Sequence, residues 1–437
     1  MPTRLDKFSG TSLKRELSLI DVITITAGSM ISSGLFVIPG IAFARTGPSV
    51  ILSYLLAALI ALPTMLSAAE LATAMPKAGG VYFFVNKSMG LGLGAIAGFA
   101  RWFSISLKSS FALIGIGVYS AVFTGINPTY ISVTLCLLFI VINLRGIRLV
   151  GKTQTLLTAF LMAVLLFISL WGLTSVSTER FVPFAPYGSG TILATAGYIF
   201  ISYGGMLSIT GLAEEVKRPK RNIPLGMLLA LGLTGIVYAL VIFVIIGTLE
   251  PDVLQGSLTP VADGAATYLD RNGVILTTIA ALLAFITTAN AGIASASRYP
   301  YAMSRDRLVP SFFQNTTQAH IPYVSILFTG VFILAAIICL KLELLVEVAS
   351  SLLMLTYILT NFAVIIMRKQ NNDKFRPSFR APLLPWLQLF SIAGLLLLLF
   401  KTGILSLLFS LILIAGSYIW YRYYILRNTN RKGLEQR

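Results

Sequence analysis

The sequence is poor in charged residues. Charged side chains make up 11% of its 437 residues, against about 25% in a soluble domain. Mean hydropathy is +0.86, and apolar runs that could cross a bilayer core of about 30 Å recur along the whole chain. These features exclude a soluble domain and predict an all-α polytopic membrane protein.

Cysteine and histidine are also scarce. Cys136, Cys339 and His320 are too few and too far apart in the sequence for a disulfide framework or a metal site. The sequence shows no phosphate-binding loop, nucleophile elbow or dinucleotide-binding glycine pattern. We therefore expect no metal, no cofactor and no catalytic residues.

The 33 basic residues outnumber the 16 acidic ones, and their positions explain the excess. Most lie in or beside the termini and alternate connections between the apolar runs. Five exceptions lie in or beside the remaining connections, namely Arg45, Arg180, Arg271, Lys341 and Lys401. One more, Lys108, lies inside an apolar run. This asymmetry follows the positive-inside rule and predicts that both termini are cytoplasmic. It also makes membrane lipid, and not nucleic acid, the expected partner of the charges.

We predict twelve membrane-spanning helices. Their ranges are 18–44, 47–74, 89–119, 129–145, 151–174, 190–214, 224–249, 271–303, 322–340, 344–367, 383–401 and 403–425. The longest outer connection, 249–270, is expected to form a lid over an outer vestibule.

The first span contains a stretch, 27–40, that is unsuited to a continuous helix. Its small, polar or helix-breaking residues are Gly28, Ser29, Ser32, Ser33, Gly34, Pro39 and Gly40. Glycine and serine are poor helix formers, and free backbone groups at membrane depth are tolerated only against protein or a water-filled cavity. A broken helix at this depth therefore predicts a binding site. Its helix ends suit a ligand with a carboxylate and an ammonium group.

The sixth span has a matching interruption in residues 198–211. Ser202, Tyr203, Gly204 and Gly205 put small or polar residues at its centre. Interrupted helices at corresponding positions of two halves indicate a transporter with inverted repeats and a binding site between them. The inference rests on position, because the two halves share little side-chain identity.

Four segments carry a resemblance to known proteins. The first span reads G-x-x-I-S-S-G-x-F-x-x-P-G over 28–40; Glu70 is followed by Pro76, Gly79, Gly80 and Tyr82; Glu214, Glu215, Pro219 and Pro224 follow the sixth span; Arg298, Arg305, Asp306 and Pro310 follow the eighth. In this order they resemble the motifs of the amino acid–polyamine–organocation transporters over about residues 15–380. One departure is Ser32, which stands where that family has glycine and narrows the pocket or adds a hydroxyl.

The resemblance implies a substrate site. The substrate carboxylate would meet amides and a hydroxyl around Ser32, Ser33 and Gly34, and the ammonium would meet carbonyls near Met30, Phe200 and Tyr203. Ser202 and Gly205 complete the expected substrate-binding set, and Phe200 corresponds to a gating aromatic residue. The alternative is that the small residues only allow close helix packing.

Lys108 lies near the middle of the third span, where an ammonium costs at least about 2.5–3.5 kcal/mol. Three interpretations are open. It binds an acidic substrate side chain, it acts as a fixed or titrating charge for coupling, or it pairs with Glu70 as a structural ion pair.

Two features of the sequence bear on ion coupling. The fifth-span lysine that replaces sodium in some relatives is Leu161 here, and sodium would need hydroxyls such as those of Thr287 and Thr288. Such hydroxyls usually bond to their own helix, so proton coupling or exchange is favoured over sodium. Glu214 and Glu215 are either part of an inner gate or a solvated rim.

The expected architecture is a 5+5 inverted-repeat fold with broken helices 1 and 6. Its parts are a cytoplasmic N-terminal segment (1–17), a first repeat (18–174), a second repeat (190–367), two further helices (383–425) and a cytoplasmic tail (426–437). The connection 120–128 has no cysteine, so the disulfide-linked glycoprotein subunit of some animal relatives is not expected.

The resulting hypothesis is a cell-membrane permease for neutral L-amino acids, since no carboxylate lies in the predicted pocket to hold a cationic side chain. An acidic amino acid held by Lys108 is the alternative substrate. A channel or a transporter-derived nutrient sensor is the alternative class. An enzyme is disfavoured because only Glu70 and Lys108 could form an intramembrane acid–base pair.

Overall fold

The structure, a computed structural model, describes residues 15–31, 33–75, 80–146, 152–318, 321–370 and 375–425, without the side chains of residues 33, 152, 153, 424 and 425. Within these residues every regular element is helical, and one isolated parallel bridge joins Leu17 to Val216. The predicted C-terminal tail, Ser32, Pro76, Gly79, His320 and most of the N-terminal segment lie outside the described residues. The all-helical prediction is confirmed.

Three consecutive helices occupy the first predicted span: α1 (Leu19–Met30), α2 (Ser33–Phe36) and α3 (Ile38–Thr46). The other α-helices are α4 (Val50–Ala74), α5 (Gly80–Met89), α6 (Leu91–Thr124), α7 (Pro128–Leu144), α8 (Lys152–Gly172), α9 (Ser189–Tyr198), α10 (Pro219–Thr248), α11 (Pro251–Gly256), α12 (Pro260–Ala296), α13 (Arg298–Arg305), α14 (Tyr323–Cys339), α15 (Leu342–Lys369), α16 (Trp386–Thr402) and α17 (Ile404–Trp420). Short 3₁₀ or π segments are η2 (Gly47–Ser49), η3 (Leu173–Ser175), η4 (Thr178–Phe181), η5 (Ile199–Tyr203), η6 (Ser208–Glu215), η7 (Ser311–Gln314) and η8 (Tyr421–Ile425).

Each of the twelve predicted ranges contains helix. Among the described residues, eight helical segments are long and apolar enough to cross a membrane, and four shorter apolar helices, α1, α7, α14 and α16, accompany them. The protein is therefore a multi-pass membrane protein. The predicted outer connection 249–270 is largely helical, because α11 lies within it and α12 begins at Pro260 and kinks at Asp270 (φ 49°, ψ −141°).

Local sequence signals set several helix ends. The Ser18 side chain accepts from the Asp21 amide while the Asp21 carboxylate accepts from the Ser18 amide, so α1 begins with a capping box. Helix α6 ends at Gly125, whose φ of 66° a glycine adopts without strain. Asn127 then caps α7, and Pro128 occupies its first turn.

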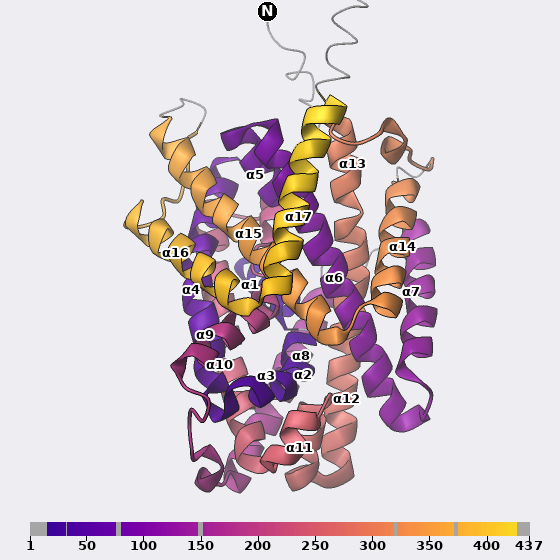
Figure 1. The fold of residues 1–437 in the computed structure, drawn as a ribbon, viewed down its shortest axis with the longest axis vertical. Helices are drawn as coiled ribbons and strands as arrows, with labels where there is room; N and C mark the ends of the chain where they lie inside the picture. The colour runs from indigo at the N-terminus through magenta and orange to yellow at the C-terminus, as the bar shows by residue number, and fades with distance from the viewer. Residues whose placement is uncertain are drawn as a thin grey trace, which may run out of the picture.

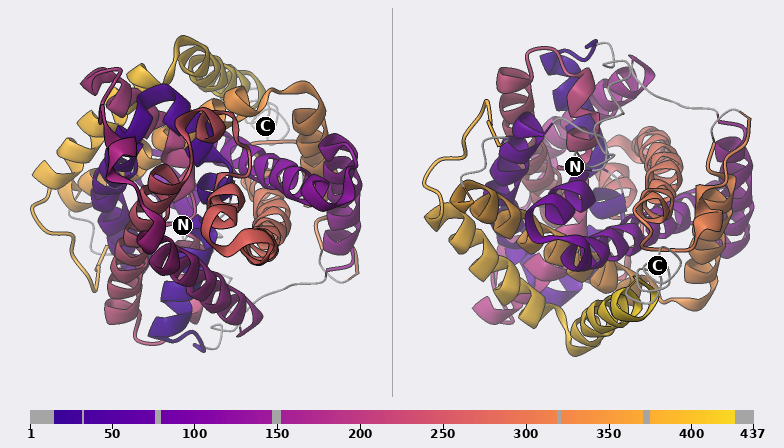
Figure 2. Two further views of the ribbon diagram at one scale, coloured as in Figure 1. Left: turned by 90° about the horizontal axis from the view of Figure 1, so that it is seen from below. Right: turned by 90° about the horizontal axis from the view of Figure 1, so that it is seen from above.

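Helix α6 is central to the bundle and packs against α5, α7, α12 and α15. Helices α7 and α14 lie side by side at the periphery (Figure 2). Helix α11 lies at one end of the long axis, and α5 and α13 lie at the other (Figure 1). The interrupted helices α1 and α9 are enclosed by α4, α8, α10, α15 and α16.

Candidate functional site

The first interruption begins where α1 ends. The backbone of Ile31 is extended (φ −71°, ψ 103°), and the chain resumes with the four-residue helix α2. Val37 separates α2 from α3, whose first turn contains Pro39. A run that is long enough to span the membrane is thus divided into three short helices, as its glycines, serines and proline predicted.

The second interruption begins where α9 ends at Tyr198. The 3₁₀ segment η5 follows, then a turn over 204–207, then the 3₁₀ segment η6. Its residues 199–207 are buried. A 3₁₀ backbone has poorer hydrogen bonds than an α-helix and is rarely this long, so other parts of the protein must hold it.

The two interruptions touch directly. A methyl group added to Gly205 would lie 2.0 Å from the Ser29 carbonyl oxygen, and one added to Gly34 would lie 2.4 Å from Ser202 Oγ. The Ser202 hydroxyl also donates to the Gly34 carbonyl at 3.2 Å. Gly34, Gly205 and Ser202 therefore allow close backbone contact between α1–α2 and the η5 region.

Tyrosine hydroxyls from the surrounding helices hold the carbonyl groups that the interruptions release. The donor–acceptor pairs are Tyr238 to Met30 (2.9 Å) and to Ser202 (3.3 Å), Tyr54 to Gly34 (2.8 Å), Tyr119 to Phe36 (2.8 Å) and Tyr357 to Tyr203 (3.1 Å). Tyr203 itself donates to the Tyr54 carbonyl at 2.9 Å. All these side chains are buried. Unpaired carbonyls at membrane depth would cost several kcal/mol each, and these bonds offset that cost.

These bonds bear on the predicted ammonium ligands. The Met30 and Tyr203 carbonyls already accept from tyrosines, and each keeps a second lone pair. The Phe200 side chain is fully buried, and its ring packs edge-on to Tyr357 with 5.6 Å between centroids. The hydroxyls of Ser32 and Ser33 lie outside the described side chains, so their roles remain predictions.

Lys108 reaches both interruptions. Its Nζ donates to the Ser29 carbonyl at 2.8 Å, and a methyl group on Gly204 would lie 3.7 Å from its Cδ. The side chain thus joins α6 to the end of α1 and to the turn after η5. The predicted structural pairing of Lys108 with Glu70 is wrong.

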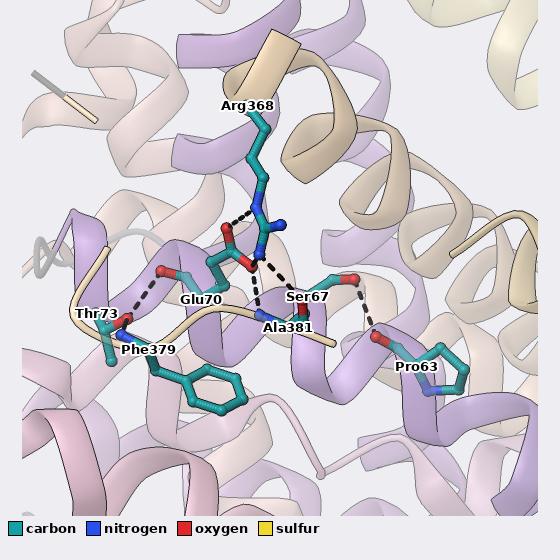
Figure 3. Close-up of polar contacts among 7 residues, drawn as sticks. All are labelled: Pro63, Ser67, Glu70, Thr73, Arg368, Phe379 and Ala381. Atoms are coloured by element: carbon teal, nitrogen blue, oxygen red, sulfur yellow. Dashed lines mark hydrogen bonds and ion pairs between the residues drawn. The ribbon is translucent and has the colours of Figure 1, made fainter. Parts of the chain in front are cut away.

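Glu70 instead forms a buried cluster with Arg368 (Figure 3). Arg368 Nε and Nη2 each donate to the Glu70 carboxylate at 2.6 Å, and the Ala381 amide donates at 2.7 Å. Arg368 also donates to the Ala381 carbonyl at 3.0 Å. This arrangement fixes α4 to the end of α15 and to the connection before α16. In the sequence Arg368 is one of the basic residues beside an alternate connection, and the tertiary structure brings it to Glu70.

The predicted coupling hydroxyls differ from each other. The Thr287 hydroxyl donates to the Leu283 and Ala284 carbonyls of its own helix. Bonding of this kind was the alternative to sodium binding in the sequence analysis. The Thr288 hydroxyl is buried and has no hydrogen-bond partner among the described residues. Whether either contacts an ion remains a prediction.

Glu214 and Glu215 lie at the end of η6, beside the start of α1. The Glu215 carbonyl accepts from the amides of Glu16 and Leu17, and the Lys217 amide donates to the Leu17 carbonyl. The backbone therefore ties the sixth predicted span to the start of the first.

Tyr82, from the second motif, reaches the fourth. Its hydroxyl donates to the Asp306 carboxylate, which joins α5 to the end of α13. Burial, and then this bond, raises the pKa of Tyr82. The two motif segments meet at the end of the molecule where α5 and α13 lie (Figure 1).

The sequence interpretation missed the tyrosines that hold the interruptions, namely Tyr54, Tyr119, Tyr238 and Tyr357. A signal was available, since a buried tyrosine hydroxyl usually needs a partner and each of these lies in an apolar span. It also missed Arg101, which was counted with the basic residues in or beside the alternate connections. In the structure Arg101 belongs to α6 and is 6% exposed.

A large cavity lies beside this region. Its volume is about 780 Å³, its lining is almost entirely apolar, and it lies between α6, α14, α15 and α17. Leu107 and Leu352 line it, whereas the next residue of α6, Lys108, points to the interruptions. The cavity is therefore separate from the polar groups described above.

Sequence comparison gives the family. Residues 17–423 match the family described as amino acid permease. The chain belongs to the amino acid permease family. The resemblance to the amino acid–polyamine–organocation superfamily is thereby confirmed, and the family consists of transporters.

Individual relatives of this permease carry different solutes. It is 26% identical to the branched-chain amino acid permease BcaP of Bacillus subtilis (strain 168), over 94% of this chain and 93% of that one. It is 24% identical to the methylthioribose transporter of the same organism, over 94% of each chain. It is 29% identical to cationic amino acid transporter 4 of Mus musculus, over 82% of this chain and 61% of that one.

Proposed function

We propose that this permease is a secondary transporter that carries amino acids across the plasma membrane by alternating access. The observation that carries the proposal is the direct contact between two helix interruptions far apart in sequence, at Ser29–Gly205 and Gly34–Ser202. Their helix ends, together with the second lone pairs of the Met30 and Tyr203 carbonyls, suit a zwitterionic ligand. The proposed layout has twelve spans, two inverted five-helix repeats and both termini in the cytoplasm.

The proposed substrate is a neutral L-amino acid. The central parts of the two interruptions, residues 27–36 and 198–207, contain no acidic residue, so they offer no carboxylate to a cationic side chain. The similarity to a branched-chain permease supports the same choice. Proton symport or exchange is the proposed coupling.

An acidic substrate is the second candidate, because Lys108 brings an ammonium group to both interruptions. Lys108→Ala should then abolish glutamate or aspartate transport while leaving neutral substrates unaffected. Loss of all transport would favour a coupling or structural role for Lys108.

Uptake by the purified protein in proteoliposomes tests the function. We expect labelled leucine, isoleucine or valine to accumulate, and unlabelled substrate inside to accelerate entry. Gly34→Trp should abolish uptake because the indole would separate the interruptions. Gly232→Trp is the matched control, since Gly232 on α10 is exposed and has open space beyond its Cα.

Flux without trans-stimulation would indicate a channel, and binding without flux would indicate a sensor. Uptake that survives Gly34→Trp would contradict the proposed site.

A further inference from the structure

Arg101 is a buried cation for which the described residues supply no hydrogen-bond partner. The residue is 6% exposed, and its Nε and Nη1 atoms are buried and make no hydrogen bond within the part of the chain that the structure describes. A buried guanidinium is normally paired, and within a membrane it carries a substantial cost. The presence of the Arg101 guanidinium at this energetic cost therefore suggests that it has a function.

The other arginines inside the bundle show what a structural role looks like here. Arg368 forms a bidentate pair with Glu70. Arg45 donates to Glu347 at 2.8 Å and lies 3.8 Å over the Tyr198 ring. Both guanidinium groups are paired with a carboxylate, whereas within the described part of the chain no carboxylate forms an ion pair with Arg101.

Arg101 lies near the proposed substrate site. It precedes Lys108 by seven residues on α6, so the two side chains leave nearly the same face of the helix, about 10 Å apart along its axis. Helix α6 also packs against α15, the helix that carries Tyr357. Tyr357 in turn donates to the Tyr203 carbonyl and packs on Phe200, so α15 links α6 to the second interruption.

The direction along α6 is also informative. Arg101 is nearer than Lys108 to the start of α6, which adjoins α5 at the end of the molecule that the proposed topology assigns to the cytoplasm (Figure 1). A ligand that moves from the interruptions toward that end along α6 would pass from Lys108 to Arg101.

We propose that Arg101 binds the carboxylate of the transported amino acid on the inner side of the central site. The inference rests on the proposed transport function. A guanidinium offers a planar fork of donors that matches a carboxylate, whereas the Lys108 ammonium is already bonded to Ser29. The ligand class is a small organic carboxylate, either the α-carboxylate of any amino acid or the side-chain carboxylate of an acidic one.

The test compares wild type, Arg101→Met, Arg101→Lys and the control Arg145→Met, which removes an exposed arginine after α7. Uptake of labelled leucine and glutamate is measured in proteoliposomes of defined orientation, and melting temperature is measured in detergent. We expect Arg101→Met to raise the half-saturating concentration at the inner face at least tenfold and to change it little at the outer face. Arg101→Lys should restore part of the loss, and Arg145→Met should have no effect.

Stability separates binding from a structural role. Replacing an unpaired buried charge with an apolar side chain should keep or raise the melting temperature, so reduced transport with undiminished stability supports the proposal. If Arg101→Met reduces the uptake of both leucine and glutamate, Arg101 binds the α-carboxylate. If it reduces the uptake of glutamate alone, Arg101 binds the side-chain carboxylate.

Three outcomes would overturn the inference. Arg101→Met could transport as well as wild type, or its melting temperature could fall enough to account for the reduced transport. The third outcome is that chloride, and no amino acid, raises the melting temperature of wild type. If wild type moves no amino acid, the proposed function itself fails.

Discussion

At the residue scale, Gly205 shows how little space separates the two interruptions. Its added methyl group would lie 2.0 Å from the Ser29 carbonyl oxygen and 2.2 Å from the carbonyl carbon. These are backbone atoms, so relief requires a shift of α1 relative to the η5 region. The Lys108 bond to the same carbonyl would be strained as well.

We therefore predict that Gly205→Ala lowers the unfolding free energy by about 1–3 kcal/mol, the usual cost of overpacking, and reduces uptake more than tenfold. Thermal unfolding and proteoliposome uptake measure the two effects. Gly232→Ala is the control, because Gly232 lies inside α10 with nothing within 4 Å and alanine favours the helix by about 1 kcal/mol. Equal behaviour of the two variants would show that the contact is not essential.

Arg101 and Lys108 illustrate a second point at this scale. Both are basic residues of α6, yet Lys108 bonds to a backbone carbonyl, whereas two buried nitrogen atoms of Arg101 find no partner among the residues that the structure describes. Residue type alone does not separate them, because the difference lies in what other helices bring to each side chain.

At the scale of elements, the Glu70 cluster joins three segments: α4, the end of α15 and the connection before α16 (Figure 3). Glu70 is fully buried, and the Arg368 side chain is 25% exposed. Removing one partner of a buried pair leaves an uncompensated charge, at a cost of about 3–5 kcal/mol. Partial hydration of Arg368 places the expected cost toward the lower end of that range.

Glu70→Gln should therefore lower the apparent melting temperature clearly. The control is Glu250→Gln, which removes the ion pair with Arg180, because Glu250 is 68% exposed and such a pair is worth about 0–1 kcal/mol. Thermal unfolding in detergent compares the two variants. Similar shifts would mean that the buried pair does not hold α4 to α15.

At the scale of the whole molecule, the proposed topology rests on the distribution of basic residues. Gln255 on α11 and Asn315 after η7 are both exposed, and α11 lies at the opposite end from α13 (Figure 1). The positive-inside rule assigns the α13 end to the cytoplasm.

We predict that, in a Cys339→Ser background, a membrane-impermeant maleimide labels Gln255→Cys in intact cells and labels Asn315→Cys only after permeabilisation. Cys339 is removed because it is exposed, whereas Cys136 is buried. The reverse pattern would invert the proposed orientation.

The sequence by itself determined the class of the protein, the presence of helix in each apolar run and the two interruptions. Low charge and long apolar runs force a helical membrane protein, and the glycines and serines of 28–34 and 202–205 make a continuous helix unfavourable. These are local properties, so they can be inferred without knowing which helices are neighbours.

Only the tertiary structure decided the partners. It assigned Glu70 to Arg368 and Lys108 to Ser29, it placed four tyrosines on the freed carbonyls, and it left Arg101 without a partner among the described residues. These pairs are separated by tens to hundreds of residues in the sequence. A hydrogen bond depends on distances of about 3 Å between atoms, and such distances are set by how the helices pack, which no single apolar run specifies.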